Sequence, residues 1–216
     1  MIRYTSFRAT ISNGSFRATT RNLAAFIFLS LALTGCFGGG TSEPTRYYTL
    51  AVENISAPKA SGTFASKSVA VKKFTIDPAY QRSNIVYRES AYDFMFYDLD
   101  LWASRPEHMI TRIVTEYTEK SGIFKNVISS GGVMPDYELS GHIGAIEEVD
   151  EGSSQSAHLT IGLTFKNVQS GAVLWEGKCD KSKPTNSREP RVTAEALSKI
   201  LAECMDEALK GIASAE

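Results

Sequence analysis

Histidine and cysteine are the side chains with which this chain could do catalytic or metal chemistry. The three histidines, His108, His142 and His158, lie far apart, and no histidine or cysteine pair has the spacing of metal ligands. Cys179 could act as a nucleophile with His142 or His158 as its base, but these positions also fit the alternation of an ordinary sheet. No Gly-x-Ser-x-Gly or His-Glu-x-x-His motif is present. We therefore expect no catalytic residue, no metal site and no cofactor.

A cluster of acidic residues follows a long alternating segment and consists of Glu147, Glu148, Asp150 and Glu151. Clustered carboxylates can bind calcium, but this cluster lacks the alternating oxygen ligands and the glycine of an EF-hand loop. We expect residues 147–155 to form the solvated turn of a hairpin.

Cys36 is the cysteine whose surroundings indicate a specific reaction. It follows an uncharged apolar run, residues 23–33, which is shorter than the ~20 residues of a membrane-spanning helix. Arginines and no acidic residue precede this run, so residues 1–35 have the layout of a secretory signal. Leu33-Thr34-Gly35-Cys36 resembles the lipobox of bacterial lipoproteins. The resemblance implies that the Cys36 thiol carries a diacylglycerol and that cleavage makes Cys36 the first residue.

Two other interpretations of this segment are a plain secretory signal with a chance cysteine and a buried apolar helix. A helix that packs against a domain with one face would carry polar residues on its other face, which residues 23–33 lack. Acyl chains offer a sufficient anchor, because each buried methylene contributes roughly 0.8 kcal/mol and two chains hold stably. An aspartate after the lipobox cysteine favours inner-membrane retention. Phe37 stands there instead, so the resemblance implies the periplasmic face of the outer membrane.

Three parts are expected along the chain: a signal peptide at 1–35, a flexible Gly/Ser/Pro-rich tether at 36–45 and one domain at 46–216. The signal contains 4 of the 23 basic residues and no acidic one, which leaves 19 basic and 24 acidic residues, a net charge of −5. This balance offers no basic excess for nucleic acid and no polybasic patch for anionic lipid. Attachment to a membrane would therefore depend on the acyl chains.

Cys179 and Cys204 form an even pair in a compartment where disulfides persist. A disulfide between them would close a loop of about 25 residues and stabilise the fold by roughly 3 to 4 kcal/mol. The alternative is two buried thiols that pack as small apolar side chains. The sequence leaves both open.

Apolar periodicity predicts the secondary structure. Strands are expected at 46–52, 68–76, 85–88, 92–102, 124–129, 137–145, 157–165 and 173–179. One helix should begin with a capping box of Ser104 and Glu107 and end at Gly122, and a second should span 193–212. The last three strands read as an antiparallel meander with one buried face. We predict an α/β or α+β fold, a mixed sheet covered by two main helices.

Large apolar side chains occupy both faces of the strand expected at 92–102, among them Tyr92, Phe94, Phe96 and Trp102. A central strand buried on both sides would explain this pattern. The functional alternative is a surface patch for a partner or for lipid, because large exposed apolar areas mark contacts. We predict that part of this stretch is an interface.

Several motifs together resemble the ABC-type transport auxiliary lipoproteins of the paraquat-inducible protein C type. After the lipobox come Tyr47-Tyr48-Thr49-Leu50, then Val69, Val71 and Phe74 in one strand, then Ile85-Val86-Tyr87-Arg88, Trp102 with Pro106, and Ala172 to Trp175. The resemblance spans the mature chain. Its motifs are structural, and none is catalytic.

This resemblance implies a fold like the N-terminal domain of TolB and a non-enzymatic accessory role in lipid transport between membranes. The implied partners are a mammalian-cell-entry (MCE) domain protein and an ABC permease and ATPase, with a homo-oligomeric ring as a further expectation. An alternative function is a lipoprotein that activates an envelope enzyme such as a peptidoglycan synthase. Such activators have long tethers, and the short tether here favours transport. A hydrolase, the third alternative, would need a polar cleft with a convergent nucleophile and base.

Overall fold

The computed structural model describes residues 43–52, 63–128 and 134–215. The chain divides into the units Met1–Glu43 and Pro44–Glu216, and every described helix and strand belongs to the second unit. The predicted signal peptide and Cys36 lie outside the described residues.

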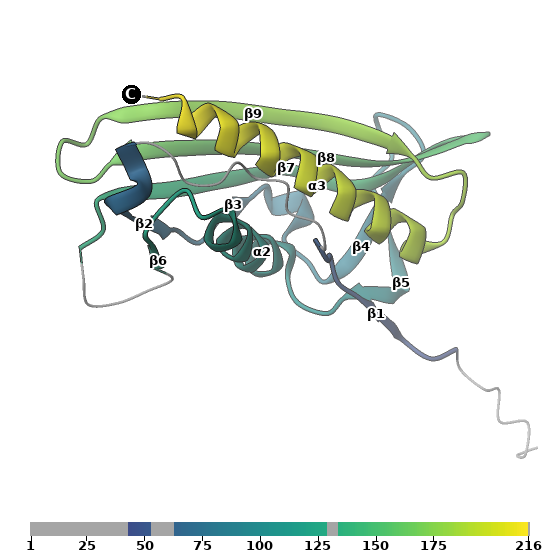
Figure 1. Ribbon diagram of the computed structural model, residues 1–216. Helices are drawn as coiled ribbons and strands as arrows, with labels where there is room; N and C mark the ends of the chain where they lie inside the picture. Colours follow the sequence, from purple (N-terminus) through teal and green to yellow (C-terminus); the bar gives the residue numbers. More distant parts are fainter. Residues whose placement is uncertain (1–42, 53–62, 129–133, 216) are drawn as a thin grey trace, which may run out of the picture. The chain divides into compact units, whose positions relative to one another are not determined.

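One mixed sheet of nine strands and two long helices make up this unit (Figure 1). The strands are β1 (Arg46–Tyr48), β2 (Ser68–Val71), β3 (Thr75–Ile76), β4 (Asn84–Arg88), β5 (Met95–Trp102), β6 (Asn126–Ile128), β7 (Tyr137–Glu151), β8 (Ser154–Asn167) and β9 (Val173–Pro184). The helices are α2 (Pro106–Ser121) and α3 (Pro190–Ala213), and short 3-10 turns span Thr63–Ser66 and Pro78–Tyr80. The predicted mixed sheet with two helices is confirmed.

Strand β7 is the centre of the sheet. One of its edges pairs antiparallel with β8 along the whole strand, and β8 pairs antiparallel with β9, which gives the predicted meander. The other edge of β7 pairs in parallel with β2, β3 and β4 in turn, at Tyr137, His142 and Glu148. The predicted strand at 68–76 is therefore two strands, which meet β7 at different positions.

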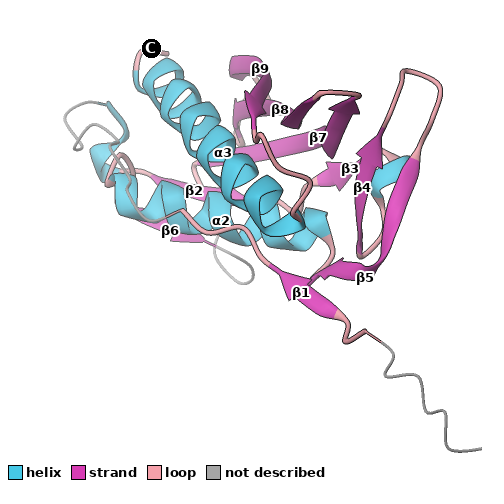
Figure 2. Ribbon diagram, turned by 90° about the vertical axis from the view of Figure 1, so that its right-hand side faces the viewer, coloured by secondary structure: helices cyan, strands magenta, loops and turns pink. Residues whose placement is uncertain are grey.

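Both helices lie on the same side of the sheet (Figure 2). Alternate residues of β8, from Ala157 to Phe165, are buried and face them. Helix α2 buries the predicted stripe of Ile110, Ile113, Val114 and Tyr117. The period of two in β8 and the i, i+3, i+4, i+7 spacing in α2 thus meet in one core.

The C-terminal end of α2 is as predicted, whereas its N-terminal end is not. Gly122 ends the helix in the left-handed conformation at φ 66°, as predicted, because glycine has no Cβ to penalise that conformation. The predicted capping box is wrong. Arg105 is the N-cap residue, no side chain caps the helix, and Glu107 instead forms an ion pair with Arg105 at 2.9 Å.

The acidic segment predicted as a solvated turn is largely strand. Strand β7 continues to Glu151 and β8 begins at Ser154, so the turn itself is short. Glu147, Glu148 and Asp150 are 2%, 1% and 5% exposed. Each of them has a polar partner from a distant part of the chain, which is what allows the carboxylates to be buried.

Candidate contact surface at strand β5

Exposed apolar side chains gather at one edge of the sheet. Six of the eight large hydrophobic residues that are exposed in the described part of the chain lie on β1, on β5 or in the turn before β5. We call these six the edge patch: Tyr47, Tyr92, Phe94, Met95, Phe96 and Leu99. Tyr92 is 97% exposed, and the side chains of Phe94 and Phe96 are 37% and 45% exposed. Scattered apolar residues are normal on a protein surface, but a gathered set of this size indicates a contact.

The topology of β5 explains why the patch is exposed. Strand β4 pairs with one edge of β5, whereas β1 pairs with the other edge only at Asp100, Leu101 and Trp102. No described strand pairs with the outer edge of residues 95–99. The register between β4 and β5 also shifts, because two steps along β4 from Asn84 correspond to five along β5. Such an irregularity locally disrupts the pairing of a strand, and in β5 successive residues on both faces, such as Met95 and Phe96, are exposed.

Aromatic and cationic contacts hold the patch in place. The ring of Phe94 lies against the ring of Tyr80 at a centroid distance of 5.3 Å. The guanidinium of Arg82 lies 4.7 Å from the ring centre of Phe96 and 5.9 Å from that of Phe94. Such cation–π contacts contribute roughly 0.5 to 1 kcal/mol at exposed sites. The rings of Phe94 and Phe96 are thus held by contacts within the domain.

A buried polar network lies beneath the patch. The hydroxyl of Tyr80 donates to Glu147 at 2.5 Å, and Arg88 Nε lies 3.5 Å from the same carboxylate. His158 links Glu147 to Asp180, with Nδ1 at 3.0 Å from Glu147 and Nε2 at 2.9 Å from Asp180. Because both imidazole nitrogens face carboxylates, the protonated ring can donate to each of them.

The pKa values of this network shift as its geometry requires. The hydrogen bond to Glu147 raises the pKa of His158, and that to Asp180 adds to the effect against the opposing effect of burial. The same contact with His158, followed by that with Lys178, lowers the pKa of Asp180 to about 2. Burial, and then the bond to Glu147, raises the pKa of Tyr80. His158 therefore remains protonated to a higher pH than a free histidine.

A second network ties the other face of β5 to α3. The hydroxyls of Tyr97 and Thr193 donate to Glu148 at 3.2 and 2.7 Å. Burial, ahead of all other causes, raises the pKa of Glu148. Arg188 pairs with the buried Asp150 at 2.9 Å. The strand that carries the patch is thereby fixed to the helix layer as well as to the sheet.

Trp102 does not belong to this surface, and its prediction as a partner residue is wrong. Its side chain is 2% exposed and is part of the hydrophobic core. Trp102 lies at the end of β5, where the strand has β1 on one edge and β4 on the other, and its side chain packs in the core cluster. Tyr92, Phe94 and Phe96 lie before that point and are exposed.

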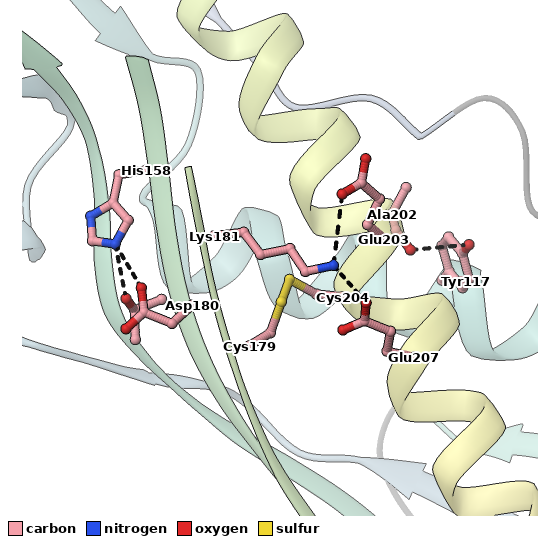
Figure 3. Close-up of a disulfide and its surroundings, with 10 residues drawn as sticks. Tyr117, His158, Cys179, Asp180, Lys181, Ala202, Glu203, Cys204 and Glu207 are labelled. Atoms are coloured by element: carbon pink, nitrogen blue, oxygen red, sulfur yellow. Dashed lines mark hydrogen bonds and ion pairs between the residues drawn. A yellow bond between two sulfur atoms is a disulfide. The ribbon is translucent and has the colours of Figure 1, made fainter. Parts of the chain in front are cut away.

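Cys179 on β9 and Cys204 on α3 are joined by a disulfide, with a Cα–Cα distance of 5.7 Å (Figure 3). Ion pairs cross the same junction beside it, Lys181 with Glu207 at 2.6 Å and Lys183 with Glu203 at 2.7 Å. Because its sulfur is bonded to Cys204, Cys179 has no thiol with which to act as a nucleophile.

The histidines occupy separate environments. His142 Nδ1 lies 2.8 Å from the hydroxyl of Thr75, and His108 is half exposed at the start of α2. Among the described residues, no group of three or more His, Cys, Asp or Glu side chains converges as metal ligands would. His158 lies on β8 between Glu147 and Asp180, and the sequence alone does not indicate these two contacts, because they form only when β7, β8 and β9 pair.

A family model for the ABC-type transport auxiliary lipoprotein component matches residues 48–208. The chain belongs to this family. The match runs from the end of β1 into α3, so it includes the disulfide and all of the edge patch except Tyr47. The resemblance inferred from the sequence motifs is confirmed. A search of the curated proteins finds no match.

Solved structures share the fold. A protein of the DUF330 family from Xanthomonas campestris superposes with a TM-score of 0.64 at 20% identity, over 77% of this chain and 93% of its own. A crystal structure of an uncharacterised protein superposes with a TM-score of 0.57 at 12% identity, over 79% of this chain and 97% of its own. At these identities the likeness concerns the fold alone. Neither α2 nor α3, nor any other helix in the described ranges, is long and apolar enough to span a membrane.

Proposed function

We propose that this family member is a non-enzymatic accessory lipoprotein of an MCE/ABC-type system that moves lipid between membranes. The observation that carries the proposal is the family match over residues 48–208, which a segment resembling a lipobox at Cys36 precedes in the sequence. The acylated Cys36 holds the domain at the periplasmic face of the outer membrane. The domain itself supplies binding surfaces.

The described geometry supports a binding role over a catalytic one. The buried carboxylates are bound to tyrosine, threonine, arginine and histidine within the fold, so they stabilise the sheet. Among the described residues, most of the large exposed hydrophobic side chains belong to the edge patch, which offers apolar contact area. An accessory component needs such surfaces, because its task is to position other proteins and membranes.

The partners that we propose are an MCE-domain protein and the ABC permease and ATPase that work with it, with several copies of this chain forming a ring. Affinity purification of the tagged full chain from gently solubilised envelopes tests this assignment. The MCE-domain protein should co-purify with the unaltered chain and be lost with Cys36→Ala, which removes the anchor. Recovery of a peptidoglycan synthase in its place would contradict transport and favour the role of an activator.

Lipidation is tested on the same preparations. Intact-mass measurement should find Cys36 as the first residue with a diacylglycerol on its sulfur. A chain that retains residues 1–35, or that runs at its unmodified mass and washes off membranes, would contradict the anchor and the location together.

A further inference from the structure

We infer that the edge patch rests on the bilayer that carries the acyl anchor, so that the domain contacts lipid through protein as well as through Cys36. The inference depends on the acylation of Cys36 proposed above. It concerns the orientation of the domain, which the proposed function leaves open.

The covalent connection brings this edge of the sheet close to the membrane. Eight residues, 36–43, separate the acylated end from Pro44, and eight extended residues span at most about 28 Å. The chain then enters the domain at β1, which lies beside β5 and pairs with it in parallel, Arg46 opposite Asp100 (Figures 1 and 2). The tether is therefore attached to the same edge that carries Tyr47, Leu99 and the aromatic turn.

The chemistry of the patch suits the headgroup region of a bilayer. Aromatic rings, tyrosine above all, are enriched at membrane interfaces, where the ring meets acyl chains and the hydroxyl meets water. Tyr92 is the most exposed of these side chains, at 97%, and the rings of Phe94 and Phe96 are also exposed. The guanidinium of Arg82 lies over both phenylalanine rings and donates through Nε to the carbonyl of Ala79, so its remaining N–H groups can meet lipid phosphates at the level of the headgroups.

The charge around the patch selects the kind of lipid. Asp93 and Asp98 are exposed in the same turn and strand, so the patch has no basic excess. Attraction to strongly anionic lipid is therefore absent, and the contact depends on apolar area. The occupant that fits is a bilayer of mainly zwitterionic lipid. The outer backbone edge of residues 95–99 stays at the level of the headgroups, where water can pair with it.

A second copy of this chain is the competing occupant, since it could add a strand to the open edge of β5. The tether favours lipid, because it holds the membrane within about 28 Å of Pro44, next to β1, and so makes even a weak lipid contact effectively intramolecular. A second copy has no such connection to this edge.

The test uses the protein as purified from envelopes after expression of the full chain, reconstituted in vesicles of phosphatidylethanolamine and phosphatidylcholine whose acyl chains are either plain or brominated, since bromine quenches nearby tryptophan. A reporter tryptophan is introduced by Tyr92→Trp or Phe96→Trp in the patch. The matched control is Val173→Trp, at a residue that is 56% exposed at the start of β9. Emission of the unsubstituted chain, which contains Trp102 and Trp175, is subtracted from each.

Brominated lipid should remove roughly half or more of the added emission at positions 92 and 96, since an interfacial contact brings side chains about 5–10 Å into the headgroup boundary. Position 173 should lose little. Equal emission in both kinds of vesicle at position 92, with the protein still bound, would overturn the inference and leave the anchor intact. A blue-shifted but unquenched signal would overturn it in favour of a second copy. Release of the protein from the vesicles would contradict acylation, and with it the proposed function.

Discussion

Breaking the disulfide should weaken the fold by a calculable amount. The bond joins residues 25 apart in sequence, and on the chain-entropy model closure of a 25-residue loop lowers the unfolded-state entropy enough to contribute roughly 3.5 kcal/mol. Reduction restores that entropy. Both sulfurs are buried, Cys204 at 1% exposure, so the reduced pair stays packed in the core and the difference should come mainly from the unfolded chain.

Urea unfolding with and without a thiol reductant measures this effect on the same protein. For a slope of about 2 kcal/mol per molar urea, the midpoint should fall by about 1.7 M on reduction. The slope itself should rise, because the reduced unfolded chain is less compact and exposes more surface. Cys179→Ala combined with Cys204→Ala should reproduce the reduced midpoint, with a small further loss from the missing sulfur atoms.

The control for this measurement is the ion pair that crosses the same junction, removed by Lys183→Met. Partly exposed pairs of this kind contribute about 0 to 1 kcal/mol, so the midpoint should move by less than a third of the disulfide effect. A reduced midpoint within about 0.3 M of the oxidised one, which corresponds to less than about 0.6 kcal/mol, would refute the reasoning. It would mean that the unfolded chain already holds these two segments together without the bond.

Two further predictions concern the sheet. His158 has a raised pKa, so its contribution to the free energy of unfolding is complete below its unfolded pKa of about 6.5 and is lost as pH rises through the folded-state value. Urea unfolding at a series of pH values should show this decline in the unaltered chain and in the His142→Gln control, and His158→Gln should abolish it. If the free energy of unfolding of His158→Gln depends on pH as that of the unaltered chain does, the role of the two carboxylate contacts is contradicted. Gly141→Ala should cost about 1 to 3 kcal/mol, because the new Cβ would clash with the ring of the buried Phe74. Gly162→Ala on β8, where the nearest atom is 4.0 Å away, is the matched control in thermal unfolding, and equal losses in both variants would contradict the close-contact explanation.

Patterns within a single segment of the sequence were sufficient to predict β8, α2 and the end of α2. Strict alternation in 157–165 predicts β8, and the structure buries that face completely. The stripe from Ile110 to Tyr117 and the glycine at 122 predict α2 and its end. The predicted start of α2 was wrong, because a Ser-x-x-Glu pattern does not prevent the glutamate from binding another side chain. Arg105 is close enough to take Glu107 as an ion pair.

The burial of the acidic residues of β7 could not be predicted from the sequence alone. Glu147, Glu148 and Asp150 read as a solvated turn because isolated carboxylates belong in water. Their partners Tyr80, Arg88, His158, Arg188 and Thr193 come from five separate segments, and only the sheet brings them together. The signal that could have been noticed is that alternation in β8 continues to Ala157, opposite Glu148. A strand that is paired at Ala157 requires its neighbour to extend just as far.

The edge patch could be interpreted only when the sequence pattern was combined with the strand pairing in the structure. The sequence marks 92–102 as apolar on both faces, and two arrangements produce that pattern: a central strand, or an edge strand with an interface. Strand β5 is both in turn, because β1 covers it only from Asp100 onward. Trp102 lies in the part that β1 flanks and is buried, whereas Tyr92, Phe94, Met95, Phe96 and Leu99 precede it and are exposed. Tyr97, between them, is half-buried and donates to Glu148. The end of β1 thus marks the point along β5 at which exposed apolar side chains give way to the core, and β1 is also where the chain enters the domain from the tether.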